Sequence, residues 1–175
     1  MMPTMFENEE QMKELLIRWL RDNGFITKKG IHVKSFEIDV AATGSIRITR
    51  EGIRRVRDRY VYAFETKIAT TYKLAKEVVE QAIIRLLAVD YVYVVVPKIA
   101  EIWKDRTTRD IIMPPINVKK LASGTYSKNI GIIAIEPNGT IEITRTARKS
   151  GLTIKELRDL VIRELSKEEN IKPLY

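Results

Sequence analysis

One stretch near the middle of the chain decides the fold class: residues 61–97, VYAFETKIATTYKLAKEVVEQAIIRLLAVDYVYVVVP. Residues 61–68 alternate as a half-buried strand does, and residues 91–97 form a β-branched and aromatic run typical of a strand covered on both faces. Between them, residues 71–89 place apolar side chains at helical spacing. The order strand, helix, strand is a βαβ unit, and it predicts a parallel pair of strands.

The first of these strands carries two charged residues, Glu65 and Lys67, in an otherwise apolar and aromatic run. Side chains alternate between the two faces of a strand, so Glu65 and Lys67 share one face while Tyr62 and Phe64 point to the other. Burying either charge alone costs on the order of several kcal/mol. The charged face is therefore predicted to be a wet cleft, a paired ion site or a metal site.

The composition is that of a soluble globular protein with an excess of positive charge. The chain has 175 residues, of which 45% are hydrophobic, and we expect a single domain over residues 1–175. Its 31 Lys and Arg against 23 Asp and Glu give a formal net charge of +8, which favours a polyanionic partner or a negatively charged surface. No apolar run approaches the roughly 20 residues of a membrane span, so we expect no membrane partner and a cytoplasmic location.

The residue types that the sequence lacks limit its chemistry. It has no cysteine, which excludes disulfides, thiolate zinc sites and a cysteine nucleophile. Its single histidine, His32, excludes a multi-histidine metal site and most catalytic triads. Any metal site must therefore use mainly oxygen ligands.

The segments before the βαβ unit predict a helix and strands. Residues 8–22 have the spacing of an amphipathic helix, with Asn8 as a possible cap. Two strand patterns follow, at residues 31–34 and 36–41, which can be continuous with each other. Asp39 lies on the polar side of the second pattern.

The segments after the unit predict a short helix, a loop, a hairpin and a final helix. The short helix is predicted over residues 99–104, and the Pro-containing and Gly/Ser-containing residues that follow, up to 129, indicate a long surface loop. Residues 131–145 alternate on both sides of an Asn-Gly pair, which predicts a tight hairpin. The sequence TIKE at 153–156 has the pattern of a capping box that opens the last helix.

The order of these charged residues resembles a known family. Asp39 on one strand, Glu65-Thr66-Lys67 on a later strand, and then a helix and a buried strand are similar to the PD-(D/E)xK nuclease superfamily. The match covers about residues 8–97, and ETK is the only E-x-K in the sequence. Ile38 stands where the motif has proline, although many members lack that proline.

The resemblance implies a fold as well as a motif. The opening helix and the strand pair look like those of archaeal Holliday-junction resolvases and related endonucleases. The implied fold class is α/β with a restriction-endonuclease-like core, in which a central mixed sheet is flanked by helices in the order helix, three strands, helix, strand. The hairpin and helix over about residues 130–168 would complete this domain.

The resemblance also implies the chemistry of phosphodiester hydrolysis. Asp39 and Glu65 are expected to bind Mg²⁺ or Mn²⁺, and the backbone carbonyl of Thr66 is implied as a further metal ligand. Lys67 is expected to position the attacking water and to stabilise the developing negative charge. Asp39, Glu65 and Lys67 are therefore the candidate catalytic residues.

Two other acids are candidates for the same site. Some members of the superfamily add a glutamate from the first helix, and Glu9 is the best-placed candidate because it lies at the edge of the apolar stripe. The plainer interpretation of Glu9 is a helix N-terminal residue favoured by the helix dipole. Glu37 shares a strand face with Asp39 and is an alternative ligand.

Positive charge is densest between the two strands that carry these acids. The candidates for contacts with nucleic acid are arginines of this stretch: Arg47, Arg50, Arg54, Arg55 and Arg57. Their simplest interpretation is a solvated hairpin, but beside a phosphate site they are suited to binding the DNA backbone.

Two hypotheses from different classes follow from the sequence. The leading one is a Mg²⁺-dependent deoxyribonuclease that cuts duplex or branched DNA and, by analogy with the family, works as a homodimer. The competing one is a non-catalytic nucleic-acid-binding protein with the same fold. In the plainest interpretation, Glu65 and Lys67 form an exposed ion pair worth only ~0.5 kcal/mol.

Overall fold

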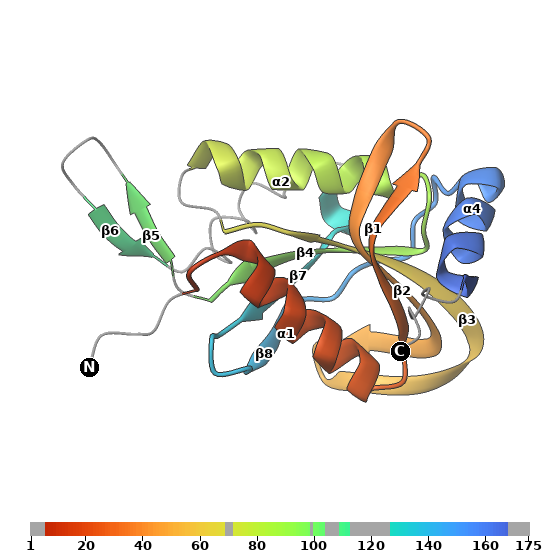
Figure 1. Cartoon of the computed structure of the whole chain (residues 1–175), viewed down its shortest axis with the longest axis horizontal. Coiled ribbons are helices and arrows are strands. Elements are labelled where there is room, and N and C mark those ends of the chain that lie inside the picture. Colours follow the sequence, from red (N-terminus) through yellow and green to blue (C-terminus); the bar gives the residue numbers. More distant parts are fainter. Residues whose placement is uncertain (1–5, 69–71, 99, 104–108, 113–126, 168–175) are drawn as a thin grey trace, which may run out of the picture.

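The structure is a computed structural model, and it describes residues 6–68, 72–98, 100–103, 109–112 and 127–167 (Figure 1). The helices and strands are, in chain order, α1 (Glu9–Asp22), β1 (Ile26–Val33), β2 (Phe36–Thr49), β3 (Gly52–Thr66), α2 (Tyr72–Arg85), β4 (Tyr91–Pro97), β5 (Ala100–Trp103), β6 (Arg109–Ile112), the 3-10 helix η1 (Ser127–Asn129), β7 (Gly131–Ile135), β8 (Ile141–Arg145) and α4 (Lys155–Ser166). From α1 to β4 the order is helix, three strands, helix, strand, as predicted.

Six strands form one mixed sheet in the order β1-β2-β3-β4-β7-β8. The first three strands are an antiparallel meander, and β3, β4 and β7 run parallel to one another. β8 returns antiparallel to β7, while β5 and β6 form a separate antiparallel pair. The fold class is therefore α/β with a mixed sheet, and the parallel pair predicted for the βαβ unit is confirmed.

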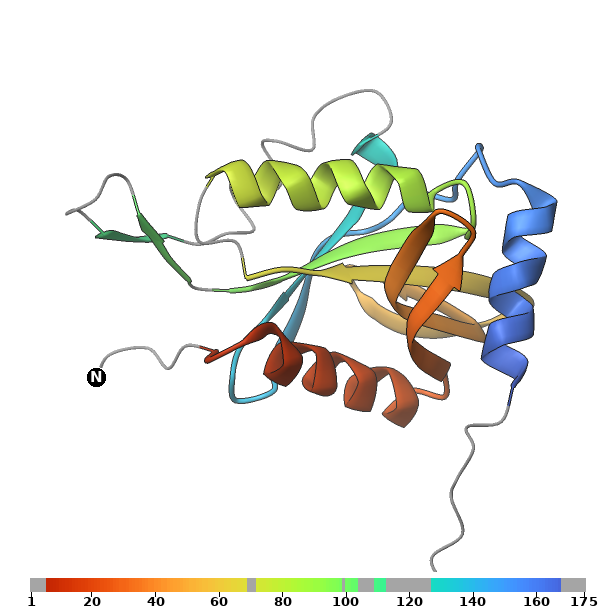
Figure 2. The same cartoon turned by 45° about the horizontal axis from the view of Figure 1, so that its top comes forward.

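The helices divide between the two faces of this sheet. Figure 2 shows α1 on one side of the sheet and α2 on the other, with α4 at one end of it. Met12 of α1 shares a core with Tyr62 and other aromatic residues of the sheet. On the opposite face, Val78 of α2 and Val161 of α4 share a second core with Ala63. Consecutive residues of β3 thus face different cores, as strand alternation requires.

The first helix begins and ends where its sequence indicates. The side chain of Asn8 accepts a hydrogen bond from the backbone N–H of Gln11 at 3.0 Å, which satisfies one of the unpaired donors of the first turn. After Asn23 the chain leaves the helix through Gly24, whose φ of 93° lies in the left-handed region. The predicted helix over residues 8–22 is confirmed.

β4 is the most enclosed strand, and all seven of its residues are buried. It lies between β3 and β7, with α1 on one face of the sheet and α2 on the other. This is the environment predicted for the β-branched run at residues 91–97. Because β4 is hydrogen-bonded to β3, it fixes the position of β3 and of its acidic residue, Glu65.

β2 and β3 extend beyond the rest of the sheet and bend across the α1 face. Their pairing changes register between Gly44 and Ile46. Beyond that point, the hydroxyl of Tyr62 donates a hydrogen bond to the carbonyl of Ile46 at 2.7 Å. Near the turn, the backbone N–H of Arg50 donates to Oγ1 of Thr146, just after β8, at 2.9 Å. The β2–β3 hairpin therefore crosses the sheet and contacts the segment that follows β8, the edge strand farthest from β1.

The two predicted strand stretches at residues 31–34 and 36–41 belong to separate strands, β1 and β2, because Lys34, at φ 52°, begins a turn between them. The alternative that they are continuous is excluded. The predicted helix over residues 99–104 is wrong, since β5 occupies Ala100–Trp103 and pairs with β6. Such short apolar runs do not distinguish a helix from a strand, and a pairing partner decides. Most of the predicted surface loop, residues 113–126, lies outside the described residues.

The predicted capping box of the last helix is wrong, although the helix itself is confirmed. Its N-cap is Ile154, which makes no side-chain capping hydrogen bond. The hydroxyl of Thr153 instead donates to the carbonyl of Val89 at 2.8 Å. Because α2 ends at Arg85 and not at residue 89 as predicted, the carbonyl of Val89 is outside the helix and accepts the hydrogen bond of this hydroxyl.

Candidate functional site

Asp39 and Glu65 lie on adjacent antiparallel strands near one end of the sheet. Val40 pairs with Phe64, so the next position of the same register places Asp39 opposite Glu65, on the face that α2 covers. Side chains in such positions start only about 5 Å apart. Because Glu65 is the last residue but one of β3, the pair lies at the carboxyl end of a parallel strand, where α/β sheets commonly bind ligands.

The carboxylate of Asp39 is held by the end of the neighbouring strand. Its Oδ2 accepts hydrogen bonds from the backbone N–H of Thr66 at 3.0 Å and from the hydroxyl of Thr66 at 3.3 Å. Thr66 is 3% exposed, so these donors are fixed by burial. Asp39 itself is half-buried, which leaves part of its carboxylate accessible.

Glu65 is buried, at 2% exposure, and pairs with Arg85, which was not predicted from the sequence. Its Oε1 accepts a hydrogen bond from Nε of Arg85 at 2.7 Å. The two other nitrogens of the Arg85 guanidinium donate to the carbonyl oxygens of Gln81 and Glu37 at 2.9 and 2.7 Å. Glu65 is therefore part of a paired ion site that ties α2 to β3.

The opposed carboxylates have an electrostatic consequence. Burial, and after it the negative charge of Asp39, raise the pKa of Glu65 to about 8. The ion pair with Arg85 lowers this pKa but offsets only part of the rise. The single positive charge of Arg85 thus does not offset the effects of burial and of Asp39, and a second positive charge would favour the ionised form of Glu65.

Lys67 pairs with Glu9 of α1, whereas Glu65 pairs with Arg85 of α2 on the opposite face of the sheet. The prediction that the charges of Glu65 and Lys67 share one face is therefore wrong. Lys67 Nζ lies 3.6 Å from Glu9 Oε1, and both side chains are about one-third exposed, at 33% and 39%. The backbone N–H of Lys67 continues the sheet by donating to Val95 at 3.0 Å. Glu9 therefore neutralises the charge of Lys67. Within the described ranges, no group of three or more Asp, Glu, His or Cys residues that could hold a metal ion is found.

The donor set can nevertheless be tested against a divalent cation. Mg²⁺ is commonly held by one or two carboxylates, with water and substrate phosphates supplying the other ligands. Asp39 and Glu65 provide two hard oxygen ligands, and a divalent cation would favour the ionised form of Glu65, whose pKa is raised. The residues fit such an ion, with Arg85 as a competing positive charge on Glu65.

Glu37, the alternative ligand, points elsewhere. Its side chain is half-exposed, and Oε2 lies 3.5 Å from Nε2 of His32, on the neighbouring strand β1. Only its backbone carbonyl contributes to the site, through Arg85. Glu37 is therefore connected to the acidic pair by its main chain.

Arg85 could have been found from the sequence. It falls on the same helical stripe as Val78 and Ala82, which form the buried face of α2. An arginine on a buried stripe requires an acidic or carbonyl partner inside the protein. Glu65 is the acid nearest to the end of the preceding strand, so the residue spacing in α2 could have predicted the pair of Arg85 with Glu65.

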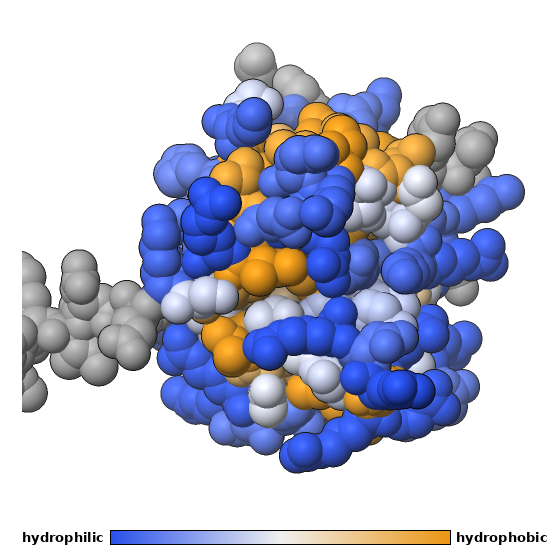
Figure 3. Space-filling model, turned by 90° about the vertical axis from the view of Figure 1, so that its right-hand side faces the viewer, coloured by the Kyte–Doolittle hydropathy of each residue, from blue (hydrophilic) through white to orange (hydrophobic). Residues whose placement is uncertain are grey.

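The arginines of the hairpin are separated from the acidic pair. Arg50, Arg54, Arg55 and Arg57 are exposed, and Figure 3 shows that hydrophilic residues cover most of the face formed by α4 and the bend of β3. Arg57 is the nearest of the four to Glu65 along β3, and at ~3.3 Å per residue that path is about 26 Å. These arginines are therefore not part of the site around Asp39 and Glu65.

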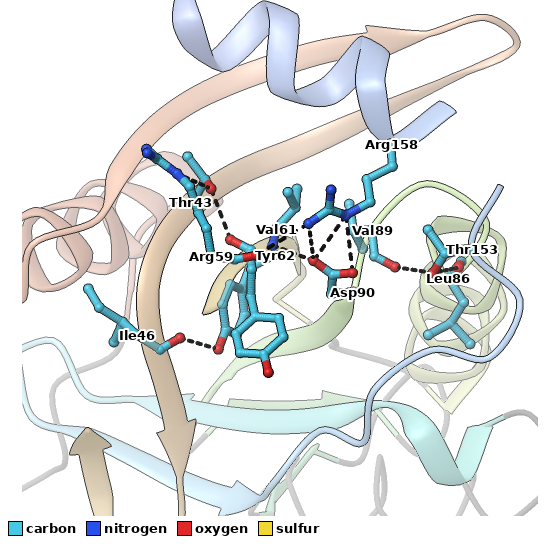
Figure 4. Close-up of polar contacts among 11 residues, drawn as sticks. Thr43, Ile46, Arg59, Val61, Tyr62, Leu86, Val89, Asp90, Thr153 and Arg158 are labelled. Atoms are coloured by element: carbon cyan, nitrogen blue, oxygen red, sulfur yellow. Dashed lines mark hydrogen bonds and ion pairs between the residues drawn. The ribbon is translucent and has the colours of Figure 1, made fainter. Parts of the chain in front are cut away.

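A second buried acid, Asp90, has a structural role (Figure 4). It is 5% exposed, and its Oδ2 accepts hydrogen bonds from the backbone N–H of Val61 at 2.7 Å and from Nη2 of Arg158 at 2.9 Å. Its own backbone N–H donates to the carbonyl of Val61, and its carbonyl accepts from Ser150. These hydrogen bonds connect Asp90, which precedes β4, to β3 and α4, so Asp90 stabilises the fold.

No family model, no curated protein and no solved structure matches this chain significantly. Within the described ranges, no helix is both long and apolar enough to cross a membrane.

Proposed function

We propose that this protein is a metal-dependent endonuclease that hydrolyses phosphodiester bonds in duplex or branched DNA. The observation that carries the proposal is the opposition of Asp39 and Glu65 at the carboxyl end of β3, with Lys67 following directly. The order helix, three strands, helix, strand around them supports a restriction-endonuclease-like core. The net charge of +8 supports a polyanionic substrate.

In this proposal Asp39 and Glu65 bind one Mg²⁺ or Mn²⁺ ion, and the backbone carbonyl of Thr66 is the third protein ligand. When bound, such an ion supplies Lewis-acid activation of a phosphoryl oxygen and a water of lowered pKa. The hydrogen bonds from Thr66 hold the Asp39 carboxylate in one orientation. The burial of Glu65 keeps bulk water away from its side of the pair.

Lys67 has the remaining role in the reaction. Its ammonium group is partly exposed, so a phosphate can approach it, and it orients the attacking water and stabilises the negative charge that develops on the phosphate. Glu9, 3.6 Å away, positions this ammonium group. Glu9 can act as a metal ligand only after its pair with Lys67 opens.

A second candidate function is a non-catalytic nucleic-acid-binding protein. Arg85 favours it, because all three of its guanidinium nitrogens are used and one of them already neutralises Glu65. A metal ion would have to compete with this clamp for Glu65. The two functions therefore differ in whether Asp39 and Glu65 bind a cation at all.

Cleavage assays test the proposal directly. Supercoiled plasmid, linear duplex, single strand and a four-way junction are incubated with Mg²⁺, Mn²⁺ or EDTA and the wild-type protein, Asp39→Asn or Lys67→Ala. Asp39→Asn keeps an oxygen that can accept from Thr66 but removes the charge, so we expect the fold to persist and cleavage to fall at least 100-fold. Asp159→Asn removes an exposed carboxylate of α4 and is the matched control.

Two results would contradict the proposal: metal-independent cleavage, or equal cleavage by Asp39→Asn and the control. Calorimetric titration with Mn²⁺ then separates the two candidates. The nuclease requires a heat of binding that Asp39→Asn abolishes, whereas the binding protein requires none. If cleavage of both strands needs a homodimer, sedimentation on duplex DNA will show two copies per cut site.

A further inference from the structure

A pocket with a strong positive charge lies at the amino-terminal ends of β4 and β7, and we call it the basic pocket. It has a volume of about 410 Å³, and its described lining residues are Arg47, Lys128, Arg145, Thr146, Ala147 and Arg148. Four of these residues are cationic, and none of them carries a carboxylate. Three separate segments supply the cations: β2, η1 and the end of β8 with the residues after it.

Arg47 contributes a donor that has no acceptor within the described structure. Its guanidinium carbon lies 5.3 Å from the centroid of the Tyr91 ring, over a residue that is 2% exposed. Its Nε is buried, and among the described residues it is the one buried side-chain nitrogen or oxygen without a hydrogen-bond partner. A buried donor without an acceptor is destabilising, so an acceptor from outside the chain would stabilise this arrangement.

The other cations of the pocket are held close together. Nε of Arg145 donates to the carbonyl of Ile130 at 2.8 Å, which fixes the position of the side chain. Burial lowers the pKa of the Arg145 guanidinium, and the positive charge of Arg148 lowers it further. Like charges kept together in this way are an arrangement that binding of an anion would stabilise.

The walls of the pocket are built by close backbone packing. The Tyr93 hydroxyl accepts from the backbone N–H of Ala147 at 3.1 Å and donates to the carbonyl of Ile48 at 3.1 Å. Gly131 makes this approach possible, because an added Cβ would overlap the Tyr93 ring and lie 2.7 Å from the nitrogen of Ala147. The backbone N–H of Arg148 donates to Asn129 at 3.0 Å. The cations therefore project from a framework fixed by the core.

We propose that the basic pocket binds phosphate groups of a nucleic-acid strand. Guanidinium groups present paired donors that match phosphate oxygens, and Arg47 and Arg148 bring two of them to one pocket, to which Arg145 and Lys128 add positive charge. The volume exceeds that needed for a single phosphate and is in the usual range for sites that take nucleotide-sized ligands.

A strand of nucleic acid fits better than a small free anion because the positive charge continues beyond the pocket. The backbone of Arg50 is bonded to Thr146 in the pocket wall, and from there the hairpin carries exposed Arg54 and Arg55. A free phosphate would use only the pocket, whereas a polyanion can contact the pocket and the hairpin together.

The basic pocket is separate from the acidic pair. Tyr91, under Arg47, belongs to the core on the α1 face, whereas Glu65 lies on the α2 face. Along the sheet, Tyr62 pairs with Tyr91 and Glu65 pairs with Val94, which places the two sites about 10 Å apart in the strand direction. This inference therefore does not depend on cleavage, and it holds equally for a protein that only binds nucleic acid.

Fluorescence anisotropy with a labelled duplex in EDTA tests the inference without any reaction. Lys128→Gln combined with Arg148→Gln removes two exposed charges of the pocket, and we expect at least tenfold weaker binding at moderate salt. The slope of log K against log salt should decrease by about 2, one for each lost phosphate contact. The control combines Lys155→Gln with Lys167→Gln, which remove the same charge from exposed positions at the two ends of α4.

Arg47→Lys provides a sharper variant, because it keeps the charge but loses the buried Nε–H. We expect it to weaken duplex binding several-fold, and we expect the wild-type Arg47 Nε–H resonance to shift when duplex is added. Thermal melting checks that each variant is folded. Equal duplex affinity of the pocket variants and the α4 control would overturn the inference.

Inorganic phosphate and a mononucleotide are the remaining probes. If either one shifts the Arg47 resonance while duplex DNA leaves it unchanged, the pocket is a small-anion site and the inference is also overturned. Because the anisotropy assay is carried out in EDTA, it measures duplex binding whether or not the protein cleaves DNA. Failure of the nuclease proposal is thereby distinguished from failure of the pocket.

Discussion

Replacing Glu65 with glutamine removes the ionisable group from the acidic pair but keeps an oxygen that can accept from Arg85. The side chain is 2% exposed and opposed to Asp39, and its pKa is raised from 4.5 to about 8 by burial and by the charge of Asp39. The folded protein therefore retains a proton at Glu65 that the unfolded chain releases as the pH rises above about 4.5. Stability must fall over this range, because the unfolded state loses the proton first.

The size of this fall follows from the difference between the two pKa values. At about 1.4 kcal/mol per tenfold change, the free energy of unfolding decreases by about 3 kcal/mol up to pH 7 and by at most about 5 kcal/mol above pH 8. For a chain of this length, 1 kcal/mol corresponds to about 2–4 °C in Tm. We therefore expect Glu65 to lower Tm by about 5–10 °C between pH 5 and pH 7.

Thermal melts of the wild type and Glu65→Gln from pH 4.5 to pH 8.5, in EDTA, measure this effect. The difference in Tm between the two proteins isolates Glu65, because every other ionisable side chain is present in both. We expect the Tm of Glu65→Gln, relative to that of the wild type, to increase steadily as the pH rises. Tm curves that run parallel over the whole range would refute the reasoning, whatever their constant offset.

Excess Mg²⁺ extends the same experiment to the proposed function. If Asp39 and Glu65 bind the ion, it favours their ionised forms and should recover part of the wild-type loss above pH 6. Glu65→Gln should respond less to the ion. A wild-type curve that is unchanged by Mg²⁺ would leave the pKa argument intact but would contradict metal binding.

Two further substitutions test the framework that positions both sites. Gly131→Ala should destabilise the protein by about 3 kcal/mol in urea denaturation, because the added methyl group meets packed backbone and an aromatic ring. Gly151→Ala, where nothing lies within 4 Å of the new Cβ, is the control, and equal effects of the two would contradict the packing argument. Asp90→Asn should cost about 3 kcal/mol, because it leaves Arg158 without its anionic partner. Asp159→Asn, on the exposed side of α4, should change stability by less than about 0.5 kcal/mol, and a loss in Asp90→Asn no larger than this would show that the buried pair contributes little.

Most of the fold could be predicted because local patterns specify it. The amphipathic spacing of residues 8–22, the buried run at 91–97 and the Asn-Gly hairpin at 131–145 are all confirmed. Each depends on a period or a turn that a few neighbouring residues determine. The failures, β5 and the cap of α4, occur where a distant partner supplies the deciding hydrogen bond.

The candidate site was predictable to a smaller extent. Alternation along two strands correctly placed the charge of Glu65 on the face opposite to Tyr62 and Phe64. The pair of Glu65 with Arg85 was missed, although the spacing of α2 places Arg85 on the buried stripe of Val78 and Ala82. Arg47 was expected to be an exposed arginine like those around it, but the bend of the hairpin places it over Tyr91.

By itself, the sequence determined the α/β class, the parallel βαβ unit, the excess of positive charge and the two acids on neighbouring strands. These properties are set by composition and by periods of 2 and 3.6 residues, which act over short stretches of chain. Only the tertiary structure decided which charges are paired, how strongly the pKa of Glu65 is raised, and that cations from β2, η1 and the end of β8 meet in one pocket. Burial and charge proximity depend on segments far apart in the chain, and their arrangement is fixed only when the whole core packs.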